Sequence, residues 1–120
     1  MSYDLTIWKR SARAKSTMTQ EVLAAIGEDA AHPAMARFDA HGFIRDLRAK
    51  FGGEERWSNE DLAPPFMFEV VDFTGTPANW ISVNIGYGDV AAVLPELVKL
   101  ATEHGLVVFD WQTEKLHGER

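Results

Sequence analysis

Residues 66–73, FMFEVVDF, and residues 79–87, NWISVNIGY, are both rich in β-branched and aromatic side chains, which favour β-strands. The five residues between them, TGTPA, favour a turn. The spacing predicts a β-hairpin with a loop of five residues. In its second strand two sets of side chains alternate: Ile81, Val83, Ile85 and Tyr87 with Trp80, Ser82, Asn84 and Gly86. One face of the hairpin is therefore predicted to be apolar and the other polar.

Two further strands are predicted outside the hairpin. Residues 3–9, YDLTIWK, alternate with a period of two, and residues 106–112, LVVFDWQ, form another β-rich run. Residues 113–120 are predicted to fray as a C-terminal tail. Because the chain has 120 residues and 46% of them are hydrophobic, residues 1–112 are predicted to form a single domain around one core.

Two helices are predicted between the first strand and the hairpin. A capping-box spacing at residues 17–20 favours a helix that ends at Gly27. The second helix is predicted to begin after the N-cap Asp39, with Phe38 and Phe43 spaced as a hydrophobic staple, and to end at Gly52. Residues 52–65 are polar and contain glycine and proline, so they are predicted to form a surface loop.

A third helix is predicted after the hairpin, with Asp89 as its N-cap and Gly105 at its end. Pro95 interrupts this segment, and proline in a helix interior costs about 3 kcal/mol. The regular helix is therefore expected to begin at Pro95, where proline would occupy the first turn.

The resulting order of elements, β-α-α-β-β-α-β, predicts an α+β fold. It favours the ferredoxin-like, or split βαβ, arrangement, in which a four-stranded antiparallel-rich sheet carries its helices on one face. The opposite face is then expected to present polar side chains and two tryptophans: Asp4, Thr6, Trp8, Trp80, Ser82, Asn84 and Asp110.

Charge and composition exclude several classes of function. The net charge is −6, and residues 51–112 contain ten acidic and two basic side chains. This balance argues against a nucleic-acid partner, since such affinity comes mostly from lysine and arginine. No apolar run approaches the roughly 20 residues of a membrane helix, and the N-terminus has no signal-peptide pattern. With no cysteine in the chain, we expect a cytoplasmic protein without membrane contact.

The sequence contains no motif that predicts catalysis, a cofactor or a metal. The histidines His32, His41, His104 and His117 lack ligand spacing, and His104 fits better as a cation near a helix C-terminus. No serine lies in a G-x-S-x-G elbow, and no phosphate-binding glycine motif is present. We therefore expect no catalytic residue, no cofactor and no bound metal.

Asp4 and Asp110 allow two interpretations, because they lie at adjoining ends of neighbouring strands. They could converge as a carboxylate pair for acid–base chemistry. The favoured alternative is that each accepts hydrogen bonds at a strand end, together with Gln112.

The four tryptophans, Trp8, Trp57, Trp80 and Trp111, also allow two interpretations. Full or partial burial is favoured for each of them, with at least two in the core. Trp8 and Trp80, however, fall on the polar side of their strands, where exposed aromatic rings beside acids are typical of a protein interface.

Both ends of the chain resemble a family of small bacterial proteins. MSYDLTIW at residues 1–8 is similar to its M-S-Y-D-L-x-V-W start, and HGLVVFDWQ at residues 104–112 to its H-G-L-V-x-Y-D-P-Q end. ERWSNEDL at residues 55–62 resembles its W-S-D-x-P-L segment. The chain departs from this pattern at Trp111, where the family more often has proline, and at Ala63. The resemblance implies a common fold, and a site, if shared, at Asp4, Trp57, Ser58, Asp110 and Gln112.

Three functions remain open. The first is a protein-binding domain, by analogy an immunity protein that neutralises a bacterial toxin, whose partner is basic. Its expected partner-binding residues are Asp4, Trp8, Trp57, Ser58, Trp80, Asn84, Asp110 and Gln112. The second is a small-ligand or enzymatic site at Asp4 and Asp110, with the loop around Trp57 as a lid. The third is a self-associating domain that forms a homodimer.

Overall fold

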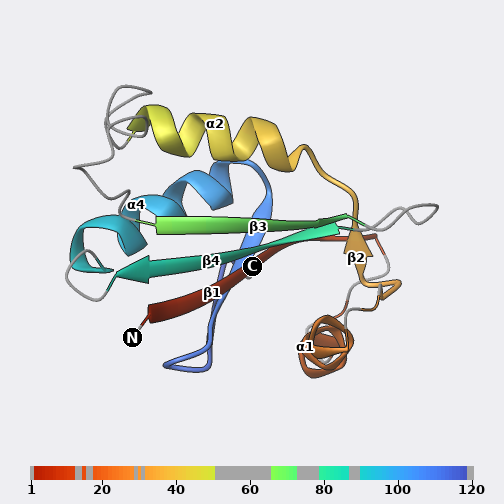
Figure 1. The fold of residues 1–120 in the computed structure, drawn as a ribbon. Coiled ribbons are helices and arrows are strands. Elements are labelled where there is room, and N and C mark those ends of the chain that lie inside the picture. The colour runs from red at the N-terminus through yellow and green to blue at the C-terminus, as the bar shows by residue number, and fades with distance from the viewer. Residues whose placement is uncertain are drawn as a thin grey trace.

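The computed structural model describes residues 2–12, 15, 18–28, 30, 32–50, 66–72, 79–86 and 90–118. For residues 2, 66–72 and 86 it describes the backbone alone. These residues form an α+β fold in which helices pack against an antiparallel sheet (Figure 1). The loop predicted at residues 52–65 and the caps predicted at residues 17, 52 and 89 lie outside the described residues.

The described residues form six strands and three helices. They are β1 (Ser2–Arg10), α1 (Thr19–Gly27), β2 (Met35–Ala36), α2 (Ala40–Lys50), β3 (Phe66–Asp72), β4 (Asn79–Gly86), α4 (Val90–Glu103), β5 (Leu106–Asp110) and β6 (Lys115–His117). The main strands lie in the order β3-β4-β1-β5-β6, and every neighbouring pair is antiparallel. The short β2 pairs with the end of β1. The predicted hairpin is confirmed as β3 and β4.

One face of the sheet forms the larger core, beneath α2 and α4. Side chains that alternate along the strands meet the apolar sides of these two helices. The fully buried members of this core include Leu5, Ile7, Phe43, Leu47, Ile81, Val83, Ile85, Leu97 and Val108. Because β1 lies between β4 and β5, its apolar side chains occupy the centre of this layer.

The other face is covered by α1 near the end of the sheet that carries Arg10. Val22, Leu23 and Ile26 of α1 pack with Trp8 and Trp80, which lie opposite each other on β1 and β4. The prediction that all helices lie on one face is therefore wrong, because α1 and α2 lie on opposite sides of the sheet (Figure 1). Two large indole rings on one sheet face require apolar cover, and the apolar stripe of α1 supplies it.

The start of α2 confirms the predicted N-cap. Asp39 Oδ1 accepts a hydrogen bond of 2.9 Å from the backbone N–H of Gly42, three residues into the helix region. Asn79, which is buried at the start of β4, accepts from the N–H of Phe38 and donates to its carbonyl, both at 3.1 Å. This pair of bonds fixes the entry of α2 against the sheet.

The predicted end of α1 at Gly27 is confirmed, whereas α4 differs from its prediction. The structure has α4 running through Pro95, so the expected start at Pro95 is wrong. Pro95 is exposed, while Val93 and Leu97 beside it are buried, and this packing offsets the missing backbone hydrogen bond. In α1 the N-cap is Met18, which makes no side-chain cap. Neither helix, nor α2, is long and apolar enough to cross a membrane.

The C-terminal segment is part of the sheet, so its predicted fraying as a tail from residue 113 is wrong. Residues 115–117 form β6, which pairs with β5 in the register Phe109↔Leu116. Gly118 follows with a φ of +86°, and a Cβ added there would lie 2.9 Å from the carbonyl oxygen of Leu106. A glycine is needed at this position to let the chain pass so close to β5.

We predict that Gly118→Ala destabilises the protein by about 1–3 kcal/mol, because alanine would be strained at this φ and would contact the Leu106 carbonyl. Urea unfolding measures the change. The matched control is Gly27→Ala, since a Cβ there meets nothing within 4 Å and alanine is favoured in helices. Equal stability of the two variants would contradict the docking of β6.

Candidate functional site

Polar side chains remain uncovered on the α1 side of the sheet, at the end away from α1. Asn84 is exposed on β4, and its side-chain Nδ2 donates to Asp4 Oδ1 on the neighbouring strand. Ser82, half-buried, lies one pleat further along β4. Together with Trp111 and Gln112 of the β5–β6 turn, these residues form what we call the open face.

The β5–β6 turn is bonded directly to the start of β1. Gln112 Oε1 accepts a 2.9 Å hydrogen bond from the backbone N–H of Asp4, and the N–H of Trp111 donates to the Asp4 carbonyl at 3.2 Å. The structure therefore brings together Asp4, Asn84 and Gln112, three of the residues that the sequence assigned to a site. It does so through hydrogen bonds among themselves.

Trp111 is the residue of this region that sequence reasoning missed. Its side chain is 41% exposed, and it is the large hydrophobic side chain most open to solvent among the described residues. The indole Nε1 donates to Thr6 Oγ1 at 2.8 Å, and the ring lies edge-on to Phe109 with centroids 5.0 Å apart. Trp111 was expected at the end of a strand, but the strand ends at Asp110.

Asp110 is a buried structural carboxylate. It is 1% exposed, and its Oδ1 accepts the backbone N–H groups of Gln112 at 2.9 Å and Thr113 at 3.2 Å. The hydroxyl of Tyr3 donates to its Oδ2. These three donors fix the β5–β6 turn, as an aspartate commonly does at a turn.

Asp4 and Asp110 do not form a pair on one face. In the register of β1 and β5, Asp110 lies opposite Leu5, so it shares the face of Leu5 beneath α2 and α4. Asp4 precedes Leu5 in β1, so its side chain points to the opposite face of the sheet. The expectation that Asp110 lies on the polar face beside Asp4 is therefore wrong, since one residue of register reverses the face.

Trp8 and Trp80 are core residues. Each is 1% exposed, which confirms the favoured interpretation that they are buried, and the alternative that they are exposed interface anchors is wrong. Their burial follows from α1, which the sequence did not place on this face. Trp57 and Ser58, the other predicted partner-binding residues, lie outside the described residues.

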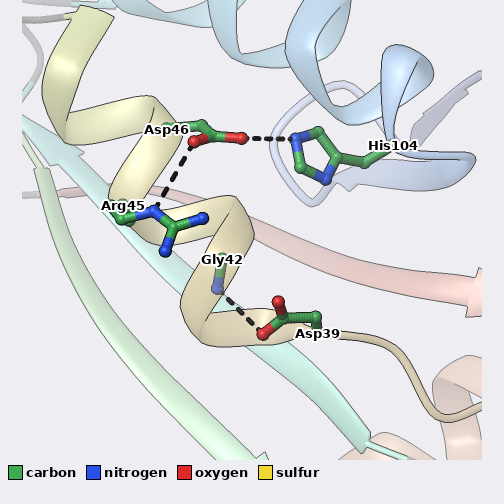
Figure 2. Close-up of polar contacts among 5 residues, drawn as sticks. All are labelled: Asp39, Gly42, Arg45, Asp46 and His104. Carbon is green, nitrogen blue, oxygen red and sulfur yellow. Dashed lines mark hydrogen bonds and ion pairs between the residues drawn. The ribbon is translucent and has the colours of Figure 1, made fainter.

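His104 makes structural contacts at the end of α4. His104 Nε2 lies 3.1 Å from Asp46 Oδ2, which joins the end of α4 to α2, and Asp46 also lies 3.8 Å from the Arg45 Nε (Figure 2). The His104 ring packs edge-on against Phe43 at 5.4 Å. The described ranges contain no group of three or more acidic or histidine side chains placed to share a metal.

A shallow groove adjoins the open face, between α1 and the β5–β6 turn. It has a volume of about 550 Å³ and is lined by Gln20, Leu23, Ala24, Phe109, Trp111 and Glu114. Asp4, Asn84 and Gln112 do not line it. The exposed ring of Trp111 thus belongs to both features and joins them into one surface.

We predict that Asp110→Ala destabilises the protein, because it removes the buried carboxylate that accepts from the Tyr3 hydroxyl and from two turn amides. A buried donor left unpaired costs about 1–3 kcal/mol. The control is Asp46→Ala, whose side chain is 46% exposed and whose surface pairs contribute little. Chemical denaturation compares the two, and a loss for Asp110→Ala no larger than for Asp46→Ala would contradict the structural role.

His117 predicts a dependence of stability on pH. Partial burial lowers the pKa of His117 from 6.5, the Lys115 ammonium lowers it further, and Asp110 opposes both. Because the unfolded chain then binds the proton more readily, the free energy of unfolding falls as the pH drops below about 6.5 and levels off below the folded-state pKa. We expect His117→Gln to remove this contribution and Lys115→Gln to reduce it, in unfolding curves recorded from pH 7.5 to 5. If the free energy of unfolding changed with pH equally in the wild type and both variants, the contribution of His117 would be contradicted.

No protein-family model, curated protein or solved structure matches the chain.

Proposed function

We propose that this chain is a protein-binding domain that engages a more basic partner through its open face. The observation that carries the proposal is Trp111, a large aromatic side chain that is 41% exposed at the rim of a groove. Tryptophan is enriched among the residues that contribute most to protein interfaces. A surrounding set of polar side chains, here Asp4, Asn84 and Gln112, is typical of an interface rim.

Charge supports the choice of a basic partner. The chain carries a net charge of −6, and charge complementarity accelerates association and selects partners. We propose, by analogy with small acidic bacterial proteins, that the chain is an immunity protein that neutralises a toxin by direct binding in the cytoplasm. We also propose that the chain is related to the family of small bacterial proteins that its two ends resemble.

The proposal includes the ferredoxin-like arrangement of the fold. The strand order β3-β4-β1-β5, antiparallel throughout, supports it, and α2 and α4 cover one face as that arrangement requires. In this description, α1, β2 and β6 are additions to the four-stranded unit. They enclose the tryptophans and shape the groove.

The alternatives have less support. A small-ligand or enzymatic site at Asp4 and Asp110 is disfavoured, because the two carboxylates lie on opposite faces of the sheet. Homodimerisation through the β6 edge is disfavoured by the three-residue length of that strand and by its exposed Lys115. A mass measurement in solution tests the homodimer directly.

We expect Trp111→Ala to weaken the complex with the native partner by at least about 30-fold, since truncating a central aromatic residue of an interface typically costs 2 kcal/mol or more. The partner is identified by affinity capture from the native host, with the product of any adjacent toxin-like gene as the first candidate. Dissociation constants for the purified pair are then measured by calorimetry.

The matched control is His41→Ala, on the exposed side of α2 across the sheet from the open face. Circular dichroism verifies that both variants are folded. Affinity that is equal in the wild type and in folded Trp111→Ala would refute binding through the open face. A wild-type association rate that does not fall as salt rises would refute the electrostatic part.

A further inference from the structure

The groove beside Trp111 has a definite chemical character. Its walls come from α1, which contributes Leu23 and Ala24, and from the β5–β6 turn, which contributes Trp111 and Glu114. Phe109 of β5 forms part of its lining from the sheet. Gln20 of α1 also lines it, so the groove is of mixed polarity, with one carboxylate on the side of the turn.

The indole of Trp111 is oriented by two internal contacts. Its N–H donates to Thr6, and its ring lies at 85° to the ring of Phe109. The one hydrogen-bond donor of the side chain is thus already used, and the exposed part of the ring offers aromatic surface. Such a surface attracts apolar groups and cations, because the face of an aromatic ring is electron-rich.

Glu114 gives the groove its charge. It is the one charged side chain among the groove-lining residues that the structure describes. Its φ is +55°, a left-handed conformation that glycine and asparagine adopt more readily than glutamate. The turn therefore holds a carboxylate at a position where another residue would be more favourable for the fold.

We infer that the groove receives an arginine side chain of the partner, whose guanidinium stacks on Trp111 and pairs with Glu114. This inference rests on the proposed function, since it presumes a protein partner at this surface. Arginine fits better than lysine, because guanidinium is planar, weakly hydrated and able to stack on an aromatic ring while bonding to a carboxylate. Its methylene chain then lies against Leu23 and Ala24.

The test is a titration of the ¹⁵N-labelled full chain with N-acetylarginine amide, followed through the indole N–H signal of Trp111. N-acetylcitrulline amide, which has nearly the same shape without the charge, is the matched ligand control. We expect a saturable shift with the arginine compound at low salt and a response at least about threefold weaker with the citrulline compound, the size of one surface ion pair. Equal responses to the two compounds would overturn the inference.

Two variants test the role of Glu114. Glu114→Asn is expected to keep or raise the melting temperature, because asparagine tolerates a positive φ, and to weaken arginine binding at least about threefold. Glu103→Gln, which removes an exposed carboxylate at the end of α4, is expected to leave the titration unchanged. Unchanged arginine binding in Glu114→Asn would overturn the inference.

The outcome is separable from the proposed function. If the partner complex depends on Trp111 while the groove does not discriminate arginine from citrulline, the arginine inference fails and protein binding stands. If the groove selects arginine but the partner complex is indifferent to Trp111, the proposed binding face fails, and the assignment of the arginine to that partner fails with it.

Discussion

The central strand β1 is hydrogen-bonded along both edges, to β4 and to β5, and its alternation assigns every layer of the molecule. Leu5 and Ile7 face α2 and α4, while Asp4, Thr6 and Trp8 face the other side. A shift of one residue would put the acid into the larger core and the leucine at the open face. The register of β1 therefore determines both where the core lies and which residues form the open face.

The second face of β1 changes character along its length. At the Arg10 end it carries Trp8, paired across to Trp80, and α1 covers both rings. At the other end it carries Asp4 beside Asn84, where the polar groups satisfy one another and remain accessible to water. A short helix is enough to bury the apolar half, and the polar half is left as a surface that another molecule can contact.

The β5–β6 turn forms one side of the groove beside this surface. Asp110 is buried and accepts two backbone N–H groups of the turn and the hydroxyl of Tyr3. With the turn held in this way, the side chain of the next residue, Trp111, is exposed. The same turn carries Glu114 to the rim of the groove. In this account the buried aspartate is a positioning residue, and the contact with a partner is made by its neighbours.

Local patterns predicted much of this fold. The hairpin, the N-cap at Asp39 and the apolar stripe of α1 follow from spacing and side-chain type, and all three are present. Two features needed tertiary information. The sequence of α1 does not say which face of the sheet it covers, so the burial of Trp8 and Trp80 was not derivable from alternation alone.

The end of β5 was the second such feature. Asp110 can begin a turn through its side chain, but the β-rich run LVVFDWQ predicts a strand that continues through Trp111 to Gln112. Extending the strand by two residues placed Trp111 in a strand and concealed its exposure. Trp111, which is exposed, is therefore the tryptophan that a partner can contact, whereas Trp8 and Trp80 are buried.

Hydrogen–deuterium exchange of the chain alone and in complex with its partner tests the binding face most directly. The account predicts that the partner slows amide exchange at the start of β1, in β4 around residues 82–84, in α1 around residues 20–24, and in the turn at residues 111–114. Protection confined to α2 and α4, on the opposite side of the sheet, would contradict it.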